Sequence, residues 1–328
     1  MTEIHPSSLP VPDKSMLSMF GDINSIKAGR CWAPLDMCEN TPIAAHSIQN
    51  SRVLDVIHEE GRVYQINSKV GDQALKTEFR LIGRNKVTTF RGLCGNHDRE
   101  IFAPIDSGDL VMDTDQQKDL LMWRAITSEM SAKMAMALYF QKQFQERIDQ
   151  GKASPNSMDP FGMESMQWMM VLHDFYKYRE KFWSPLIVDT DKNLNRGDIF
   201  NKRHILKDTG AKLAASSFFV VRGNGSDSAG HLGVNIWPVG NDTYVQISYV
   251  REDIPVAPKL IREYLYKKKF TTRSVSSLLL NYVQNFVLKP SVVDNWPDEK
   301  RKALINVFSE NVLGNPVSNL TDTYDLFA

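Results

Sequence analysis

Residues 93–98 read Leu-Cys-Gly-Asn-His-Asp, and this motif, together with two earlier cysteines, decides how the amino-terminal third is expected to fold. The chain has three cysteines, Cys31, Cys38 and Cys94, and His97 follows the third. A Cys-x6-Cys pair and a Cys-x2-His pair supply the four soft ligands of a tetrahedral structural zinc. We therefore predict that Zn2+ is bound by Cys31, Cys38, Cys94 and His97.

A second histidine, His46, stands between the two pairs in the stretch Ala45-His46-Ser47-Ile48-Gln49. Three roles are open for it. It can act as a general base, it can replace Cys31 or Cys38 as a zinc ligand, or it can be a buried histidine that donates to a backbone carbonyl.

Taken together, the cysteine pair, the Ala-His-Ser-Ile strand and the Leu-Cys-x-Asn-His motif before a helix resemble the His-Asn-His (HNH) endonucleases. The core of that family is a ββα-metal, treble-clef zinc fold. The resemblance covers residues 31–106 and implies that His46 deprotonates the attacking water, that Asn96 holds the backbone around the site, and that Asp98 binds a catalytic Mg2+ or Mn2+. Two positions depart from the family: Ala45 stands where an acidic metal ligand is common, and Asp98 where the motif ends in histidine.

The function that the resemblance implies is metal-dependent hydrolysis of phosphodiester bonds, and phage defence or a related conflict system is the expected setting. The substrate is open between DNA and RNA, and we favour DNA. The alternative is a catalytically inactive zinc module that docks nucleic acid or protein. Asp55 and Asp106 are the other carboxylates that would make a second metal site credible if they fold close to Asp98.

Composition and charge restrict how nucleic acid can be bound. The 328 residues include 39 Lys plus Arg and 39 Asp plus Glu, so the net charge is zero and binding requires a local patch. One dense basic cluster is present, and it is either a solvated helix face or a surface for the phosphate backbone. Its members are Lys259, Arg262, Lys267, Lys268, Lys269 and Arg273.

The domain prediction is a flexible arm over 1–28, the HNH-like zinc module over 29–108, a helical region over 109–315 with a small antiparallel sheet at about 215–250, and a tail over 316–328. The fold class is therefore α+β. We find no apolar run long enough to span a membrane and no signal sequence, and we expect a cytoplasmic protein.

Apolar periodicity predicts helices over 51–60, 115–150, 162–182, 275–288 and 297–313. Alternation predicts strands over 63–66, 87–90, 216–222, 231–238 and 243–250, with a loop or short hairpin over 67–86. The helices over 115–150 and 162–182 are rich in methionine. We expect these methionines in the core, or on a surface that binds a partner protein or a second copy of the chain.

Overall fold

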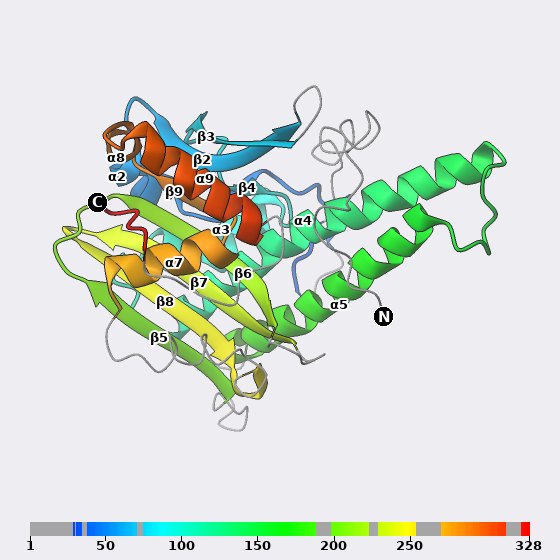
Figure 1. Cartoon of the computed structure of the whole chain (residues 1–328). Coiled ribbons are helices and arrows are strands. Elements are labelled where there is room, and N and C mark those ends of the chain that lie inside the picture. The colour runs from blue at the N-terminus through cyan, green and yellow to red at the C-terminus, as the bar shows by residue number, and fades with distance from the viewer. Residues whose placement is uncertain are drawn as a thin grey trace.

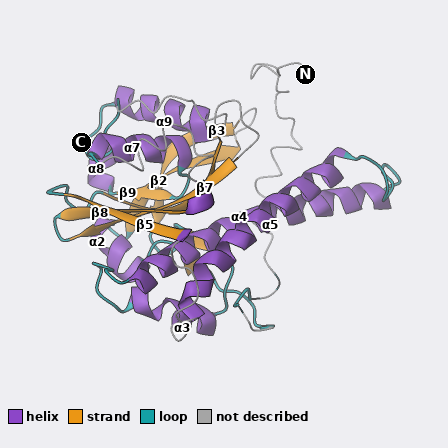
Figure 2. Ribbon diagram, turned by 90° about the horizontal axis from the view of Figure 1, so that it is seen from below, coloured by secondary structure: helices purple, strands orange, loops and turns teal. Residues whose placement is uncertain are grey.

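The chain folds as a mixed α+β protein in which an antiparallel sheet lies between two layers of helices (Figures 1 and 2). The computed structural model describes residues 29, 31–34, 38–70, 75–187, 198–222, 229–253, 270–312 and 323–328. The α+β class is confirmed. The small sheet is wrong, because the described residues form a sheet of seven strands.

The strands of this sheet follow the order β3-β2-β9-β6-β7-β8-β5, and the paired neighbours are antiparallel. Their bounds are β2 Arg62–Val70, β3 Leu75–Gly83, β5 Ile199–Leu206, β6 Leu213–Arg222, β7 Ala229–Val239, β8 Asp242–Val250 and β9 Phe286–Leu288. The predicted strands over 216–222, 231–238 and 243–250 are confirmed as parts of β6, β7 and β8. A tight turn at Gly240, whose φ is +60°, joins β7 to β8.

The stretch predicted as a loop or short hairpin forms most of a long hairpin instead. Strands β2 and β3 pair along their whole lengths, and Tyr64 of β2 pairs with Leu288 of β9. This pairing extends the sheet into the amino-terminal third of the chain, where a separate zinc module was expected. Two short strands remain outside the sheet: β1, Ala45–His46, pairs with β4, Thr89–Phe90.

Three further expectations differ from the structure. The helix predicted over 51–60 is only a helical turn, Asn50–Leu54, followed by α2, Asp55–Ile57. The helix predicted over 275–288 ends at Tyr282, and Phe286–Leu288 become a central strand. A fully buried strand carries consecutive apolar residues, so periodicity alone does not separate it from a buried helix. Leu326 and Phe327, expected in an unstructured tail, are buried in the core.

Each face of the sheet is covered by its own layer. On one face lie α7 (Thr272–Tyr282), α8 (Pro290–Asp294) and α9 (Asp298–Val312), which share a core with the inward side chains of β6, β7 and β8. On the other lie α3 (Gly95–Asp106), α4 (Asp115–Asp149) and α5 (Pro160–Ile187), together with the segment around the cysteines. No helix among the described residues is long and apolar enough to cross a membrane.

Helices α4 and α5 form a hairpin whose far end extends well beyond the sheet (Figure 1). A capping box between Thr114 and Gln117 starts α4, and the Asp159 carboxylate before α5 accepts from Arg147 Nε at 2.7 Å. The helices predicted over 115–150 and 162–182 are confirmed as α4 and α5. Met122 and Met130 are buried in the core, whereas Met163, Met166, Met169 and Met170 are exposed on the outer side of α5.

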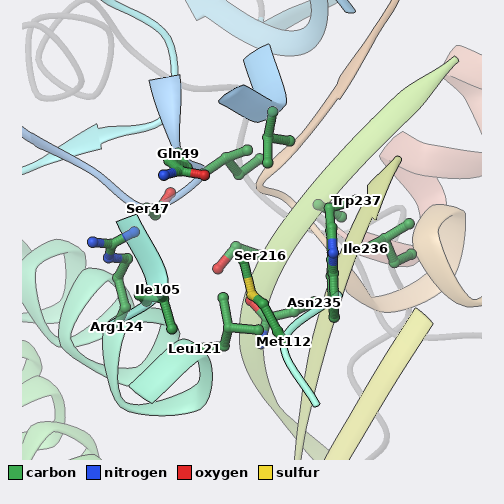
Figure 3. A pocket seen from close by; sticks show the side chains of 13 residues that line it. Ser47, Gln49, Ile105, Met112, Leu121, Arg124, Ser216, Asn235, Ile236 and Trp237 are labelled. Atoms are coloured by element: carbon green, nitrogen blue, oxygen red, sulfur yellow. The ribbon is translucent and has the colours of Figure 1, made fainter. Parts of the chain in front are cut away.

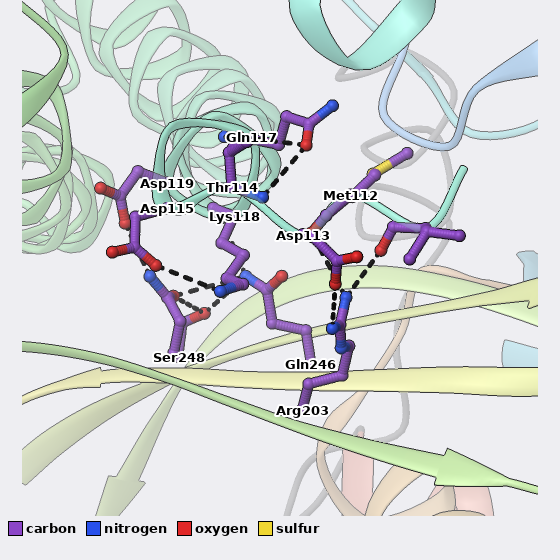
Figure 4. Close-up of polar contacts among 12 residues, drawn as sticks. Met112, Asp113, Thr114, Asp115, Gln117, Lys118, Asp119, Arg203, Gln246 and Ser248 are labelled. Atoms are coloured by element: carbon purple, nitrogen blue, oxygen red, sulfur yellow. Dashed lines mark hydrogen bonds and ion pairs between the residues drawn. The ribbon is translucent and has the colours of Figure 1, made fainter. Parts of the chain in front are cut away.

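Polar contacts fasten the first turns of α4 to the sheet (Figure 4). Arg203 of β5 donates to the carbonyl of Val111 at 2.7 Å and pairs with Asp113. Gln246 of β8 donates to the carbonyl of Lys118 at 2.9 Å. Residues 110–119 are thereby held against β5 and β8, and the position of α4 over the sheet is fixed.

Candidate metal centre

The four predicted zinc ligands come together. The ligand atoms of Cys31, Cys38, Cys94 and His97 all lie within 4.8 Å of one another. In the part of the chain that the structure describes, they form the only cluster of three or more side chains able to hold a metal ion. Cys31 and Cys38 precede β1 in the chain, and Cys94 and His97 lie at the start of α3.

Backbone hydrogen bonds bring the two segments side by side. The amide of Trp32 donates to the carbonyl of Gly92 at 2.8 Å, and the amide of Ile43 donates to the carbonyl of Leu93 at 2.9 Å. Cys94 is the N-cap residue of α3, so His97 lies one turn further on the same helix. These contacts place both cysteines of the first segment beside the helix start.

The spacing between the ligand atoms suits a tetrahedral ion. Zinc–sulfur and zinc–nitrogen bonds of about 2.3 and 2.05 Å place two sulfurs roughly 3.8 Å apart and a sulfur and a nitrogen roughly 3.6 Å apart. Here His97 Nδ1 lies 3.4 Å from both Cys31 Sγ and Cys94 Sγ, and Cys38 Sγ lies 3.9 Å from Cys94 Sγ. The Cys3His group is therefore compatible with a structural Zn2+.

The surroundings of the thiols differ. Backbone N–H groups of His97 and Asn96 at the start of α3 lower the pKa of Cys94 to about 7, which favours the thiolate that binds a metal. Burial raises the pKa of Cys31 to about 11. A positive ion at the centre would offset this effect on Cys31, because a coordinated thiol is deprotonated outright.

His46 stands apart from this cluster. It lies on β1, is half-buried, and its Nε2 is 3.1 Å from the carbonyl oxygen of Arg84. The Nε2–H group is therefore the donor, and Nδ1 is left as the acceptor nitrogen. Burial lowers the pKa of His46. The hydrogen bond to the Arg84 carbonyl acts in the opposite direction and the nearby Arg124 lowers the pKa further, so the net effect favours the neutral ring. Of the three roles expected for His46, the structure favours a histidine that donates to a backbone carbonyl. Cys31 and Cys38 both lie in the metal-ligand cluster and His46 does not, so His46 does not replace either cysteine.

The remaining catalytic candidates lie on α3. Asn96 is exposed, and its side chain accepts from Arg99 Nη2 at 3.2 Å. Asp98 is partly buried, its Oδ1 has no hydrogen-bond partner, and burial raises its pKa. The catalytic roles of Asn96 and Asp98 remain predictions.

Sequence reasoning did not identify Arg124 of α4, which organises the charges around Asp98. Its guanidinium donates to both carboxylate oxygens of Asp106, at 2.9 and 2.6 Å, and lies 3.9 Å from the ring centroid of Phe102. Asp106 thus lies in the neighbourhood of Asp98 but is already paired. Asp55 pairs with Arg84. Arg124 was overlooked because it lies within the apolar pattern of a long helix, where only its 3% exposure reveals a special role.

The predicted nucleic-acid surface falls mostly outside the described residues. Lys259, Arg262, Lys267, Lys268 and Lys269 lie in the range 254–269, which the structure does not describe. Arg273 is described and is exposed in the first turn of α7. The basic cluster as a whole remains a prediction.

Comparisons of the chain with protein-family models, with curated proteins and with solved structures found no match.

Proposed function

We propose that the Cys3His group holds a structural Zn2+ in a treble-clef or ββα-metal module, and that this module belongs to a metal-dependent endonuclease of the HNH type. The order of the elements supports this proposal. A segment with two cysteines is followed by the β1–β4 ladder, and α3 then opens with Cys94 and His97. Two ligands from a loop and two from the start of a helix form a closed structural site.

The observation that carries the catalytic part is the hydrogen bond from His46 to the Arg84 carbonyl. It fixes the proton on Nε2 and leaves Nδ1 able to accept a proton from water. Burial keeps the imidazole neutral, which is the form that a general base requires. His46 would deprotonate water for attack on a phosphodiester, while the Arg84 carbonyl stabilises the imidazolium that forms.

A catalytic Mg2+ or Mn2+ would find one carboxylate on α3. Asp98 Oδ1 lacks a hydrogen-bond partner, and Asp106 is engaged by Arg124. Mg2+ is commonly held by one or two carboxylates, with water and substrate phosphate at its other positions, so the single carboxylate of Asp98 would be sufficient in number. Such an ion would polarise the phosphate and stabilise the leaving oxygen.

The second candidate is a zinc-stabilised module that docks nucleic acid or protein without cutting it. The pairing of Asp106 with Arg124 and of Asp55 with Arg84 favours this candidate, because both carboxylates are withdrawn from metal binding. The two candidates agree on Zn2+ and differ on His46.

The test measures bound metal and nucleic-acid cleavage in parallel. Wild type, His46→Ala and the control His173→Ala, which changes an exposed histidine on α5, are assayed for zinc content. Cutting of plasmid DNA and of RNA is assayed with and without Mg2+ or Mn2+. We expect one zinc per chain in all three proteins and a loss of cutting of about 10²- to 10⁴-fold in His46→Ala alone.

One result would decide against the nuclease, and another against the role of His46. Zinc-loaded wild type that cuts neither nucleic acid under any condition leaves the docking module as the function. Equal cutting by wild type and His46→Ala removes the role of His46. Absence of zinc from all three proteins would contradict the structural part of the proposal independently of catalysis.

A further inference from the structure

A small cavity lies where the segment after β1, helix α4 and the sheet meet (Figure 3). Its volume is about 20 Å³, taken as the space open to the centre of a water molecule. Apolar side chains such as Ile105, Leu121 and Trp237 form part of its wall. Five polar side chains also line it. Ser47 is already hydrogen-bonded to the Thr88 carbonyl and to Asn285, and the other four are Gln49, Arg124, Ser216 and Asn235.

Two of these side chains come from the sheet. Ser216 of β6 and Asn235 of β7 are directly paired across the ladder, so their side chains stand next to each other on one face. Each is 3% exposed. Ser216 Oγ and Asn235 Nδ2 nevertheless have no hydrogen-bond partner.

The other two are held in place by Asp106 at the end of α3. Gln49 Nε2 donates to the Asp106 backbone carbonyl at 2.6 Å, and Arg124 uses both terminal nitrogens on the Asp106 carboxylate. The groups left over are Gln49 Oε1 and Arg124 Nε, which are buried and have no partner. Neither side chain can turn its unpaired atom to the solvent without giving up a bond to Asp106.

The four unpartnered atoms are chemically complementary to one kind of molecule. Arg124 Nε and Asn235 Nδ2 are N–H donors, Gln49 Oε1 is an acceptor, and the Ser216 hydroxyl can accept or donate. Buried polar groups are nearly always satisfied, by protein or by ordered water. A water molecule offers two donors and two acceptors, and needs roughly 10 to 15 Å³ measured in this way. The cavity therefore has the volume for one water.

We propose that this cavity is a hydration site that binds one ordered water molecule, which joins the segment carrying Ser47 and Gln49 to α4 and to β6 and β7. The site is independent of the proposed nuclease activity and of zinc. Since Gln49 lies three residues after His46, the water connects the strand that carries His46 to the main sheet.

The first test is a crystal structure at a resolution where ordered waters are visible. We expect one water within hydrogen-bond distance of Arg124 Nε and Asn235 Nδ2 and of at least one of the two oxygens. A dry cavity, or side chains that bond directly to one another, overturns the proposal.

The second test uses the sign of a stability change and does not require crystals. If Ser216 Oγ has no partner at all, Ser216→Ala removes an unsatisfied buried group and the melting temperature stays the same or rises. If the hydroxyl binds water, the same substitution breaks a hydrogen bond, and we expect the melting temperature to fall by about 2 °C.

The matched control is Ser277→Ala on α7. Ser277 is also 3% exposed, its Oγ also lacks a partner, and it does not line this cavity. We expect no decrease of the melting temperature for Ser277→Ala. Equal shifts in the two variants would show that Ser216 has no special partner and would contradict the hydration site.

Discussion

The sheet and the region around the four metal-ligand side chains are held together by different kinds of interaction. In the sheet, six of the seven strands have eight to eleven residues and most pair along long ladders, and helices cover both faces. Among the described residues around Cys94, one short ladder joins β1 and β4, which have two residues each. The sheet depends on backbone pairing and apolar burial, whereas the cysteine region has little backbone pairing and combines apolar burial with four converging side chains.

This difference predicts unequal responses to the loss of single side chains. A buried apolar residue of the sheet shares its contribution with many neighbours, and its truncation to alanine costs about 2 to 5 kcal/mol. Cys31 and Cys94 are buried in the apolar core as well, but a metal ligand would in addition hold the ion that the other three ligands share. Binding of structural zinc contributes roughly 10 to 16 kcal/mol to the folding of isolated zinc modules, so one missing ligand can unfold such a region.

The largest effect is therefore expected for Cys94→Ser. We expect loss of bound zinc and loss of hydrogen-exchange protection in α3 and in the β1–β4 ladder, because the segment 31–43 is released from the helix start. Strands β6, β7 and β8 should keep most of their protection. The measurement is hydrogen–deuterium exchange followed by mass spectrometry, with zinc content determined on the same samples.

Treatment of the wild type with a strong zinc chelator serves as the matched control, since it removes the ion and leaves all side chains in place. It should reproduce the pattern of Cys94→Ser. Unchanged protection of residues 95–106 in both experiments would mean that backbone and apolar contacts already hold the region, and the comparison with the sheet would fail.

The contact between strand β7 and helix α4 can be strained at Gly233. A Cβ atom added at this position of β7 would overlap Sδ and Cε of Met122 on α4, and Met122 is fully buried. We expect Gly233→Ala to lower the free energy of unfolding by about 1 to 3 kcal/mol, the usual cost of overpacking. Denaturant unfolding measures this free energy. The double variant with Met122→Ala should lose less stability than the sum of the losses in the two single variants, because the shortened side chain leaves room for the added Cβ atom. Additive losses would show that α4 does not press on β7 at this point.

A single side chain also matters at Asp253, beside β7 and α5. Tyr178 Oη donates to Asp253 Oδ1 at 2.6 Å, and burial raises the pKa of Asp253 to about 6. The folded state binds the proton of the Asp253 carboxyl group more tightly than the unfolded chain does. Proton binding by Asp253 therefore stabilises the fold fully below about pH 3.9, and this stabilisation is lost as pH rises to about 6.

Asp253→Asn removes that titration and keeps an oxygen to accept from Tyr178. We expect the variant to be more stable than wild type at pH 8, by on the order of 2 kcal/mol, and similar to it near pH 4. Thermal unfolding between pH 4 and 8 measures the difference. A constant difference across this range would show that the carboxyl of Asp253 does not change its charge there.

The sequence predicted the Cys3His cluster and the long helices but underestimated the sheet. Cysteine spacing identifies ligands because few other roles require it, and the periodicity of α4 and α5 extends over many turns. In contrast, β9 is a three-residue strand whose role comes from pairing with β2 and β6, far away along the chain. Such pairing is a tertiary property that local patterns do not contain.

The same reasoning applies to the candidate catalytic residues. His46 was found because it stands in a recognisable stretch, but its partner is the backbone carbonyl of Arg84, which carries no side-chain signal. Arg124 and Gln49 acquire their roles only from their contacts with Asp106. Ligands that act by residue type can be read from a sequence, whereas groups that act through orientation require the fold.

The smallest effect is expected on the outer face of α5, where neither kind of interaction operates. Met166 is 63% exposed, whereas Phe175 on the same helix is 1% exposed and lies edge-to-face with Phe218 of β6. Met166→Gln should change the free energy of unfolding by less than about 0.5 kcal/mol, while Phe175→Ala should cost about 3 to 5 kcal/mol. Denaturant unfolding at several protein concentrations measures both. A large decrease in the free energy of unfolding of Met166→Gln that depends on protein concentration would mean that another copy of the chain covers this face in solution. The far end of the α4–α5 hairpin would then be stabilised by apolar burial, as the sheet is.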